Sequence, residues 1–198
     1  EPLPTSSGSR QLLDDVNFYL NEGDKVGVIG INGTGKSTFL RVIAGQLPPD
    51  SGTIARKPNL QVSMLQQNPQ MQDKATILEQ VLSSMPPQYR EVSEYEAKAM
   101  LMRLGLSDTE RRIGTLSGGE RQRAAIARAT LLCPKVLLAD EPTGNLDEKT
   151  GARVAEVLKK LNRDMGMTLV IVTHNRELAD NMDRSLELRS GELYAQDS

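Results

Sequence analysis

Three apolar runs stand out along the chain, Lys25–Ile29, Val136–Ala139 and Thr168–Thr173. Each run is nearly continuous rather than alternating with polar residues, which is typical of strands buried on both faces of a parallel sheet. Helical patterns lie between the runs. The segment Lys36–Ala44 ends at a glycine, and the segment Thr150–Asp164 carries its apolar residues on one stripe.

Strands that alternate with helices predict an α/β fold with a mostly parallel sheet flanked by helices. Residues 73–132 break this alternation, because they show helical patterns and no convincing strand. We therefore expect a single domain with a nucleotide-binding core, residues 1–72 and 133–198, and an inserted helical subdomain, residues 73–132. Ligands of such sheets bind beyond the carboxyl ends of the strands.

The composition gives no sign of nucleic-acid binding, of a membrane span or of an internal disulfide. The chain has 198 residues, 38% of them hydrophobic, and a net charge of −2. Such a charge gives no reason to expect nucleic acid as a direct partner. There is no apolar run of the roughly 18 residues that span a bilayer, and the one cysteine, Cys133, allows no internal disulfide. A cytoplasmic location is expected.

The first glycine-rich turn, Gly30–Thr38, follows one predicted strand and opens a predicted helix. Its sequence GINGTGKST matches the pattern G-x-x-x-x-G-K-[ST] of a phosphate-binding loop. Glycines let successive N–H groups point at phosphate oxygens, and the helix start attracts anions. Lys36 is expected to reach the β and γ phosphates, and the Ser37 hydroxyl to bind Mg²⁺.

Acidic residues end the second predicted strand in the sequence VLLADEP. Asp140 is placed to hold Mg²⁺, and Glu141 to accept a proton from an attacking water. An acidic turn before a proline would explain these residues without any function. His174, the one histidine, follows the third strand, where contact with the γ-phosphate is the favoured role over a purely structural one.

The second glycine-rich turn, Leu116–Glu120, has the sequence LSGGE. Ser117 and Glu120 have the spacing of a capping box at a helix start. Capping does not explain Gly118 and Gly119, which are expected to leave the helix start bare and accessible to an anion. Because this turn lies in the helical section, we expect it to bind phosphate held by another copy.

Together these motifs resemble the nucleotide-binding domain of ABC ATPases, P-loop NTPases that bind ATP and Mg²⁺. GINGTGKST resembles the Walker A motif, LSGGE the signature, VLLADEP the Walker B motif with its catalytic glutamate, and VTHN the loop of His174. GNLD is similar to the D-loop with Asp147, and LQQNPQ to the Q-loop, whose glutamine is taken as Gln67 with Gln66 as the alternative.

The resemblance implies catalytic roles for Glu141, His174 and Gln67, and Mg²⁺ binding by Ser37, Gln67 and Asp140. It also implies that two domains pack head to tail, so that Ser117, Gly118, Gly119 and Glu120 contact the partner's ATP in trans. Within one copy, the expected ATP contacts are Gly30, Ile31, Asn32, Gly33, Thr34, Gly35, Lys36, Ser37 and Thr38.

Different stretches of the sequence resemble two different branches of the family. The stretch ADEPTGNLDEKTG resembles the ATPase subunits of lipoprotein-release and macrolide-export transporters, whereas residues 12–54 and 93–106 look more like ABC-F proteins. The mixture fits an engineered chimera or an unusual natural homologue. The family's N-terminal antiparallel β region is expected to be reduced, and Ser6 or Ser7 falls about where an aromatic residue would stack on adenine.

Three functions follow from the resemblance. The first is the ATP-hydrolysing subunit of an ABC exporter, which dimerises and drives a membrane-embedded partner from the cytoplasmic face of the inner membrane. The second is a ribosome-associated ATP switch of the ABC-F kind, the one case in which direct nucleic-acid contact is expected. The third is a nucleotide-binding module, engineered or truncated, with little turnover.

Overall fold

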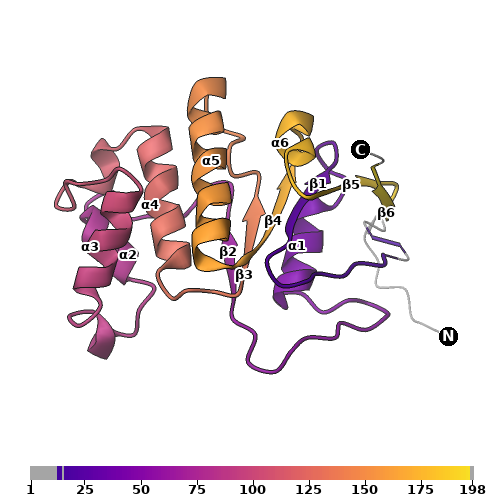
Figure 1. Ribbon diagram of the computed structural model, residues 1–198, viewed down its shortest axis with the longest axis horizontal. Coiled ribbons are helices and arrows are strands. Elements are labelled where there is room, and N and C mark those ends of the chain that lie inside the picture. The colour runs from indigo at the N-terminus through magenta and orange to yellow at the C-terminus, as the bar shows by residue number, and fades with distance from the viewer. Residues whose placement is uncertain (1–12, 15, 197–198) are drawn as a thin grey trace, which may run out of the picture.

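The computed structural model describes residues 13–14 and 16–196, which form one mixed sheet with helices on both faces (Figure 1). The strand order is β2-β3-β4-β1-β5-β6. The strands are β1 Lys25–Ile29, β2 Val62–Leu65, β3 Val136–Asp140, β4 Thr168–Thr173, β5 Arg184–Arg189 and β6 Glu192–Ala195. The first five are parallel, and only β6 runs antiparallel, to β5.

Six α-helices accompany the sheet in the described residues. They are α1 Lys36–Ala44, α2 Ile77–Leu82, α3 Glu94–Arg103, α4 Gly118–Thr130, α5 Glu148–Met165 and α6 Arg176–Asp180. Short 3₁₀ helices cover Pro87–Tyr89 and Ile113–Thr115. The predicted mostly parallel α/β sheet is confirmed, and the helix predicted at 150–164 begins two residues earlier.

Alternate side chains of the central strands enter two separate cores. On one face Val136 and Leu138 of β3 pack with Phe39 and Leu40 of α1. On the other face Leu137 and its neighbours join a core that continues into α2–α6. This explains the continuous apolar runs, because the apolar residues of these strands are buried on both faces of the sheet. It also shows that residues 73–132, which contain no strand of the sheet, share a core with one of its faces.

The antiparallel region at the N-terminus was expected to be reduced, and the described residues before β1 fit that expectation. The chain before β1 contains no strand there, and the antiparallel strand is β6, near the other end of the chain. Phe18 packs edge to face on Phe39 of α1, with ring centroids 5.1 Å apart. The segment therefore covers α1 through side-chain packing rather than through strand pairing.

Register brings the loops after three strands to one edge of the sheet. Ile29, at the end of β1, is opposite Thr173 at the end of β4, and Asp140 of β3 is opposite Val172. The residues that follow these strand ends are therefore neighbours, although more than a hundred residues separate some of them along the chain. The site described next is built at this edge.

Candidate functional site: a buried lysine and carboxylate at the strand ends

The first glycine-rich turn leaves the start of α1 open. Gly33 and Gly35 have φ values of 84° and 98°, in the left-handed region that favours glycine. Gly35 is the N-cap of α1, and no side chain caps the helix there. The N–H groups of the first helical turn are thus free of side-chain partners, and together with the helix dipole they suit a phosphate group.

Lys36 lies beneath this turn, with only 6% of its side chain exposed. Its ammonium donates hydrogen bonds to the carbonyls of Gly30 at 2.6 Å and Ile31 at 3.1 Å. The Nζ atom also lies 3.3 Å from Oε1 of Glu141, which is equally buried. A buried cation needs such hydrogen-bond and ion-pair partners, and these partners hold the ammonium beneath the turn.

Contacts with the end of β4 fix the position of Glu141. Its N–H donates to the carbonyl of Val172 at 2.9 Å, and its φ of 44° is unusual for a residue other than glycine. The Oε2 atom lies 3.0 Å from Nδ1 of His174 and accepts the His174 N–H at 3.3 Å. His174 thus contacts the carboxylate of Glu141, a contact that the sequence did not indicate.

At this edge the buried Oδ1 of Asp140 accepts no hydrogen bond, whereas the buried Oε1 of Glu141 already has the Lys36 ammonium 3.3 Å away. A buried carboxylate oxygen without a partner, such as Oδ1 of Asp140, suits a cation. Within the described residues no three His, Cys, Asp or Glu side chains cluster as a metal site. The unpartnered Oδ1 of Asp140 fits Mg²⁺, which binds through one or two carboxylates and completes its shell with phosphate and water. Ser37, at the start of α1, is exposed and can supply a hydroxyl.

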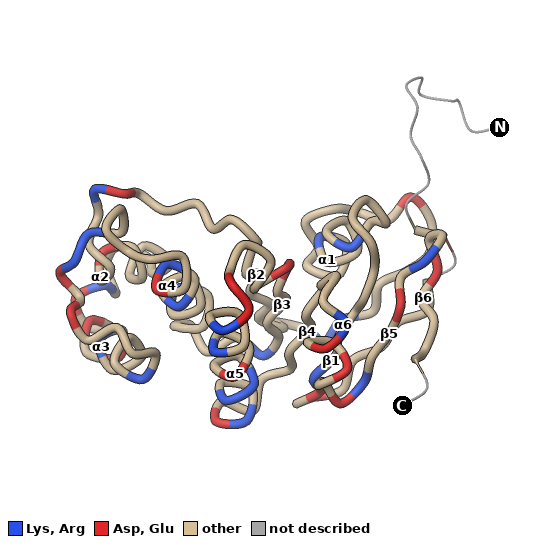
Figure 2. The backbone as a smooth tube through the Cα atoms, turned by 90° about the horizontal axis from the view of Figure 1, so that it is seen from above, with Lys and Arg blue, Asp and Glu red and all other residues tan. Residues whose placement is uncertain are grey.

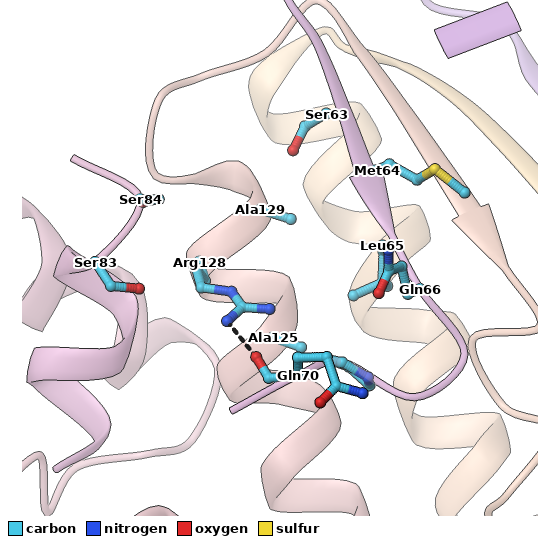
Figure 3. Close-up of a pocket in the computed structure, with 11 residues that line it drawn as sticks. Ser63, Met64, Leu65, Gln66, Gln70, Ser83, Ser84, Ala125, Arg128 and Ala129 are labelled. Carbon is cyan, nitrogen blue, oxygen red and sulfur yellow. Dashed lines mark hydrogen bonds between the residues drawn. The ribbon is translucent and has the colours of Figure 1, made fainter. Parts of the chain in front are cut away.

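The two candidate glutamines point to different places. Nε2 of Gln67 lies only 3.1 Å from where a Cβ on Gly144 would be, beside the turn that follows Glu141. Gln66 instead lines a cavity of about 370 Å³ between β2, α4 and the end of α2 (Figure 3). In that cavity Arg128 of α4 donates to the carbonyl of Gln70 at 2.8 Å. This geometry supports Gln67 as the glutamine of the site.

Asp147 serves as the N-cap of α5. Its Oδ1 accepts the N–H of Thr150 at 3.0 Å, and the hydrogen bonds from Thr150 lower the pKa of this carboxyl. The loop before it is tied to the Gln67 loop, because Asn145 donates to Asn68 at 2.6 Å. The predicted D-loop and Q-loop are therefore joined by a direct side-chain contact.

The second glycine-rich turn was expected to leave the helix start bare, but the structure closes it with side chains. Ser117 and Glu120 form a complete capping box at the start of α4. Gly119 is buried, and a Cβ there would lie 2.4 Å from Cγ2 of Thr150. The glycine is required by the close approach of α4 to α5, so intramolecular packing explains a residue that we had attributed to anion access.

This turn contacts the start of α5 rather than the phosphate loop of its own chain. A Cβ on Gly118 would meet Leu146, and one on Gly119 would meet Thr150. Glu120 is bonded to Arg111, an ion pair of 2.7 Å that the sequence did not indicate, because a separation of nine residues across a turn follows no helical or strand period. Ser6 and Ser7, which stand about where the family's adenine-stacking aromatic residue would fall, lie outside the described residues.

The described helices include none that is long and apolar enough to cross a membrane. The ABC transporter family matches residues 13–144. The lipoprotein-releasing system ATP-binding protein LolD of Oleidesulfovibrio alaskensis is 43% identical over 206 residues, which cover 93% of this chain and 88% of the relative. LolD of Nitratidesulfovibrio vulgaris is 44% identical over 207 residues, with 93% and 87% coverage. The chain belongs to the ABC transporter family.

Solved structures agree with this assignment. The dimeric structure of a bacterial ABC transporter cassette matches with a TM-score of 0.77 and 31% identity, covering 94% of this chain and 91% of that one. A dimeric post-hydrolysis cassette bound to ADP and Pi matches with a TM-score of 0.76 and 31% identity, covering 94% and 90%. The chain is therefore an ABC ATPase, which binds ATP with Mg²⁺ and hydrolyses it.

The suggested ABC-F character of the N-terminal half finds no support. The LolD relatives align over 93% of the chain, so the same protein type covers both halves. A chimeric origin finds no support in these relatives either.

Proposed function

We propose that this ABC ATPase is the energising subunit of an exporter and works as a head-to-tail dimer with Mg-ATP at the interface. One observation carries the proposal. A phosphate loop with an open helix start shares one edge of the sheet with a buried carboxylate that contacts both Lys36 and His174. This is the arrangement that phosphoryl transfer to water requires, a positioned anion site beside a general base.

Each residue then has a role. The backbone of residues 30–38 and the Lys36 ammonium bind the phosphates. Ser37, Asp140 and Gln67 would hold Mg²⁺, which would supply positive charge to offset that of the phosphates. Glu141 orients the attacking water and accepts its proton at Oε1, the oxygen that lies 3.3 Å from Nζ of Lys36. His174 holds the other oxygen, Oε2, in place.

The helical subdomain, residues 73–132, supplies the second half of the site to another copy. Ser117, Gly118, Gly119 and Glu120 face the nucleotide of the partner, with Asp147 holding the adjoining loop at α5. In support, the contacts of Gly118 and Gly119 within the chain are to Leu146 and Thr150 and leave the serine exposed. The LolD relatives are named for a lipoprotein-releasing system, so a membrane-embedded transporter subunit is the proposed partner, at the cytoplasmic face of the inner membrane.

The test is the mass of the Glu141→Gln chain in solution with and without ATP and Mg²⁺. Loss of the base should trap the ATP-bound state, so ATP should convert the monomer to a dimer. Hydrolysis by the same variant should fall by about 100-fold or more, the usual loss for a general base. A chain that binds ATP and stays monomeric would refute the dimer.

A second substitution separates the two halves of the site. Ser117→Arg adds bulk and charge at the exposed helix start and should prevent dimerisation in the Glu141→Gln background. Nucleotide binding to the monomer should stay within about twofold, because the serine contacts no residue of the phosphate loop of its own chain in the described structure. Dimerisation that survives Ser117→Arg would exclude this turn from the interface.

A further inference from the structure

The hydroxyl of Ser117 is already engaged inside its own chain. It donates to Oε2 of Glu120 at 2.9 Å and accepts the Glu120 N–H at 3.3 Å. The Ser117 N–H donates to the same Oε2 at 2.9 Å. A hydroxyl has one proton to donate, so the bond to Glu120 competes with any bond from Ser117 to a phosphate.

Glu120 also places a negative charge beside this hydroxyl. Its pKa is lowered to about 2, first by the hydrogen bond from Arg111 and then by that from the Ser117 N–H. The carboxyl is therefore ionised throughout the physiological range. An anion that approached Ser117 would meet a carboxylate within one hydrogen-bond length of its target, and two like charges at close range repel.

Arg111 is the residue that offsets this charge. Its Nη1 lies 2.7 Å from Oε1 of Glu120 and its Nη2 lies 3.4 Å from Oε2, so the guanidinium spans both oxygens. Nη2 also donates to the carbonyl of Thr115 at 3.3 Å, just before the turn. The backbone of Arg111 is fixed as well, because its carbonyl accepts the N–H of Ile77 at 2.9 Å. A planar fork on both carboxylate oxygens is a geometrically specific ion pair.

We propose that Arg111 is a positioning residue of the in-trans nucleotide site: it neutralises Glu120 and holds it so that Ser117 can meet the phosphate of a partner's ATP. This inference rests on the proposed function, since it assumes that Ser117 faces a second copy. Arg111 itself acts only through Glu120, which is the one carboxylate paired with it in the described residues.

The test uses the Glu141→Gln chain and adds Arg111→Ala. Without the guanidinium, Glu120 faces the incoming phosphate with its charge unpaired. ATP-driven dimerisation should weaken by roughly tenfold or more, the size expected when like charges meet near a protein surface. Binding of ADP to the monomer should be unchanged, because Arg111 contacts no residue of the phosphate loop in the described structure.

Arg103→Ala is the matched control. Arg103 forms an ion pair of the same length, 2.7 Å, with Asp164, and it lies on α3 outside the turn. Its removal changes the net charge by the same amount and should leave dimerisation within about twofold of the parent. Equal losses in the two variants would overturn the proposal, because the effect would then come from net charge or general stability.

A second variant separates neutralisation from a structural role. Glu120→Gln keeps the shape of the capping side chain and removes its charge. If Arg111 acts by offsetting that charge, the double variant Arg111→Ala/Glu120→Gln should recover most of the dimerisation that Arg111→Ala loses. A merely structural arginine would give no such rescue. Arg111→Lys, which keeps the charge, should dimerise within a few fold of the parent.

The outcomes distinguish the two proposals. A parent Glu141→Gln chain that stays monomeric with ATP refutes the dimer, and the role of Arg111 falls with it. A parent that dimerises while Arg111→Ala dimerises equally well leaves the dimer intact and overturns only the role of Arg111.

Discussion

The two glycine-rich turns both open helices, yet they use glycine for different reasons. In the first, Gly35 adopts a left-handed φ of 98°, and no side chain caps α1. In the second, Ser117 and Glu120 cap α4 completely, and Gly119 is packed on Thr150. One turn is an open anion site in its own chain, and the other is closed by its own side chains.

A side chain in place of glycine would cause a different problem in each turn. At Gly35 any Cβ strains the backbone, because left-handed φ values disfavour L-residues. Gly119 lies within α4, and only the missing space toward Thr150 excludes a Cβ. Charges differ too. The first turn lies over the buried Lys36, whereas the second carries an acidic cap whose charge is offset from outside the turn by Arg111. Along the backbone α1 carries basic residues only, and α4 carries both signs of charge (Figure 2).

The largest expected effect tests the first turn. Lys36→Ala should weaken ATP binding by roughly 100-fold or more, because the phosphates lose a charge-assisted contact. Titration of a fluorescent ATP analogue measures it. Lys25→Ala is the control, since it removes a lysine from β1 whose partner, Asp183, is half exposed. If Lys36→Ala bound ATP as the parent does, the first turn would not be the phosphate site.

A smaller effect tests the packing role of the second turn. Gly119→Ala should lower the free energy of unfolding by about 1–3 kcal/mol, because the new Cβ overlaps Cγ2 of Thr150. Helix propensity alone would favour alanine by about 1 kcal/mol. Urea unfolding measures whether Gly119→Ala lowers or raises the free energy of unfolding. A stabilised Gly119→Ala chain would contradict the packing explanation.

Two further variants sharpen this test. Thr150→Ser removes Cγ2, so Gly119→Ala should be better tolerated in the Thr150→Ser background than in the parent. Gly118→Ala is the matched control, because its Cβ would meet only the flexible end of Leu146 at 3.2 Å. Its effect on unfolding should be the smaller of the two.

The smallest effect concerns the acidic cap. The pKa of Glu120 is about 2 in the fold against an ordinary value of 4.5. A lowered pKa contributes stability that is present above pH 4.5 and is lost as the pH falls toward 2. Glu120→Gln should therefore be less stable than the parent at pH 6, and the gap should narrow by pH 3. Urea unfolding at the two pH values measures this, and a constant gap would exclude the ionic contribution.

The sequence predicted the strands whose apolar residues form a continuous run. β1, β3 and β4 were recognised because their apolar residues follow one another without a break and are buried. β5 and β6 were missed, because in RSLELR and ELYA charged residues interrupt the apolar ones, and β2 was missed because it has only four residues. Strands near a sheet edge bury fewer side chains, so their sequences carry a weaker signal.

In the site, too, residues in local motifs could be predicted from the sequence, and contacts between distant segments could not. The residue types of the phosphate loop and of the Asp140–Glu141 pair are local and were readable along the chain. The contact between His174 and Glu141 was not, since it joins two strand ends that only the register of β3 on β4 brings together. The ion pair of Arg111 with Glu120 and the approach of α4 to α5 likewise depend on tertiary packing.

The sequence by itself determined the two glycine-rich turns, the acidic strand end and the parallel sheet, because each depends on residue types at short, fixed spacing. Only the tertiary structure decided which of two adjacent glutamines lies beside the turn at Gly144, why Gly119 is a glycine and which residue offsets the charge of Glu120. These depend on the distance between segments that are far apart along the chain, and packing of the whole core sets that distance.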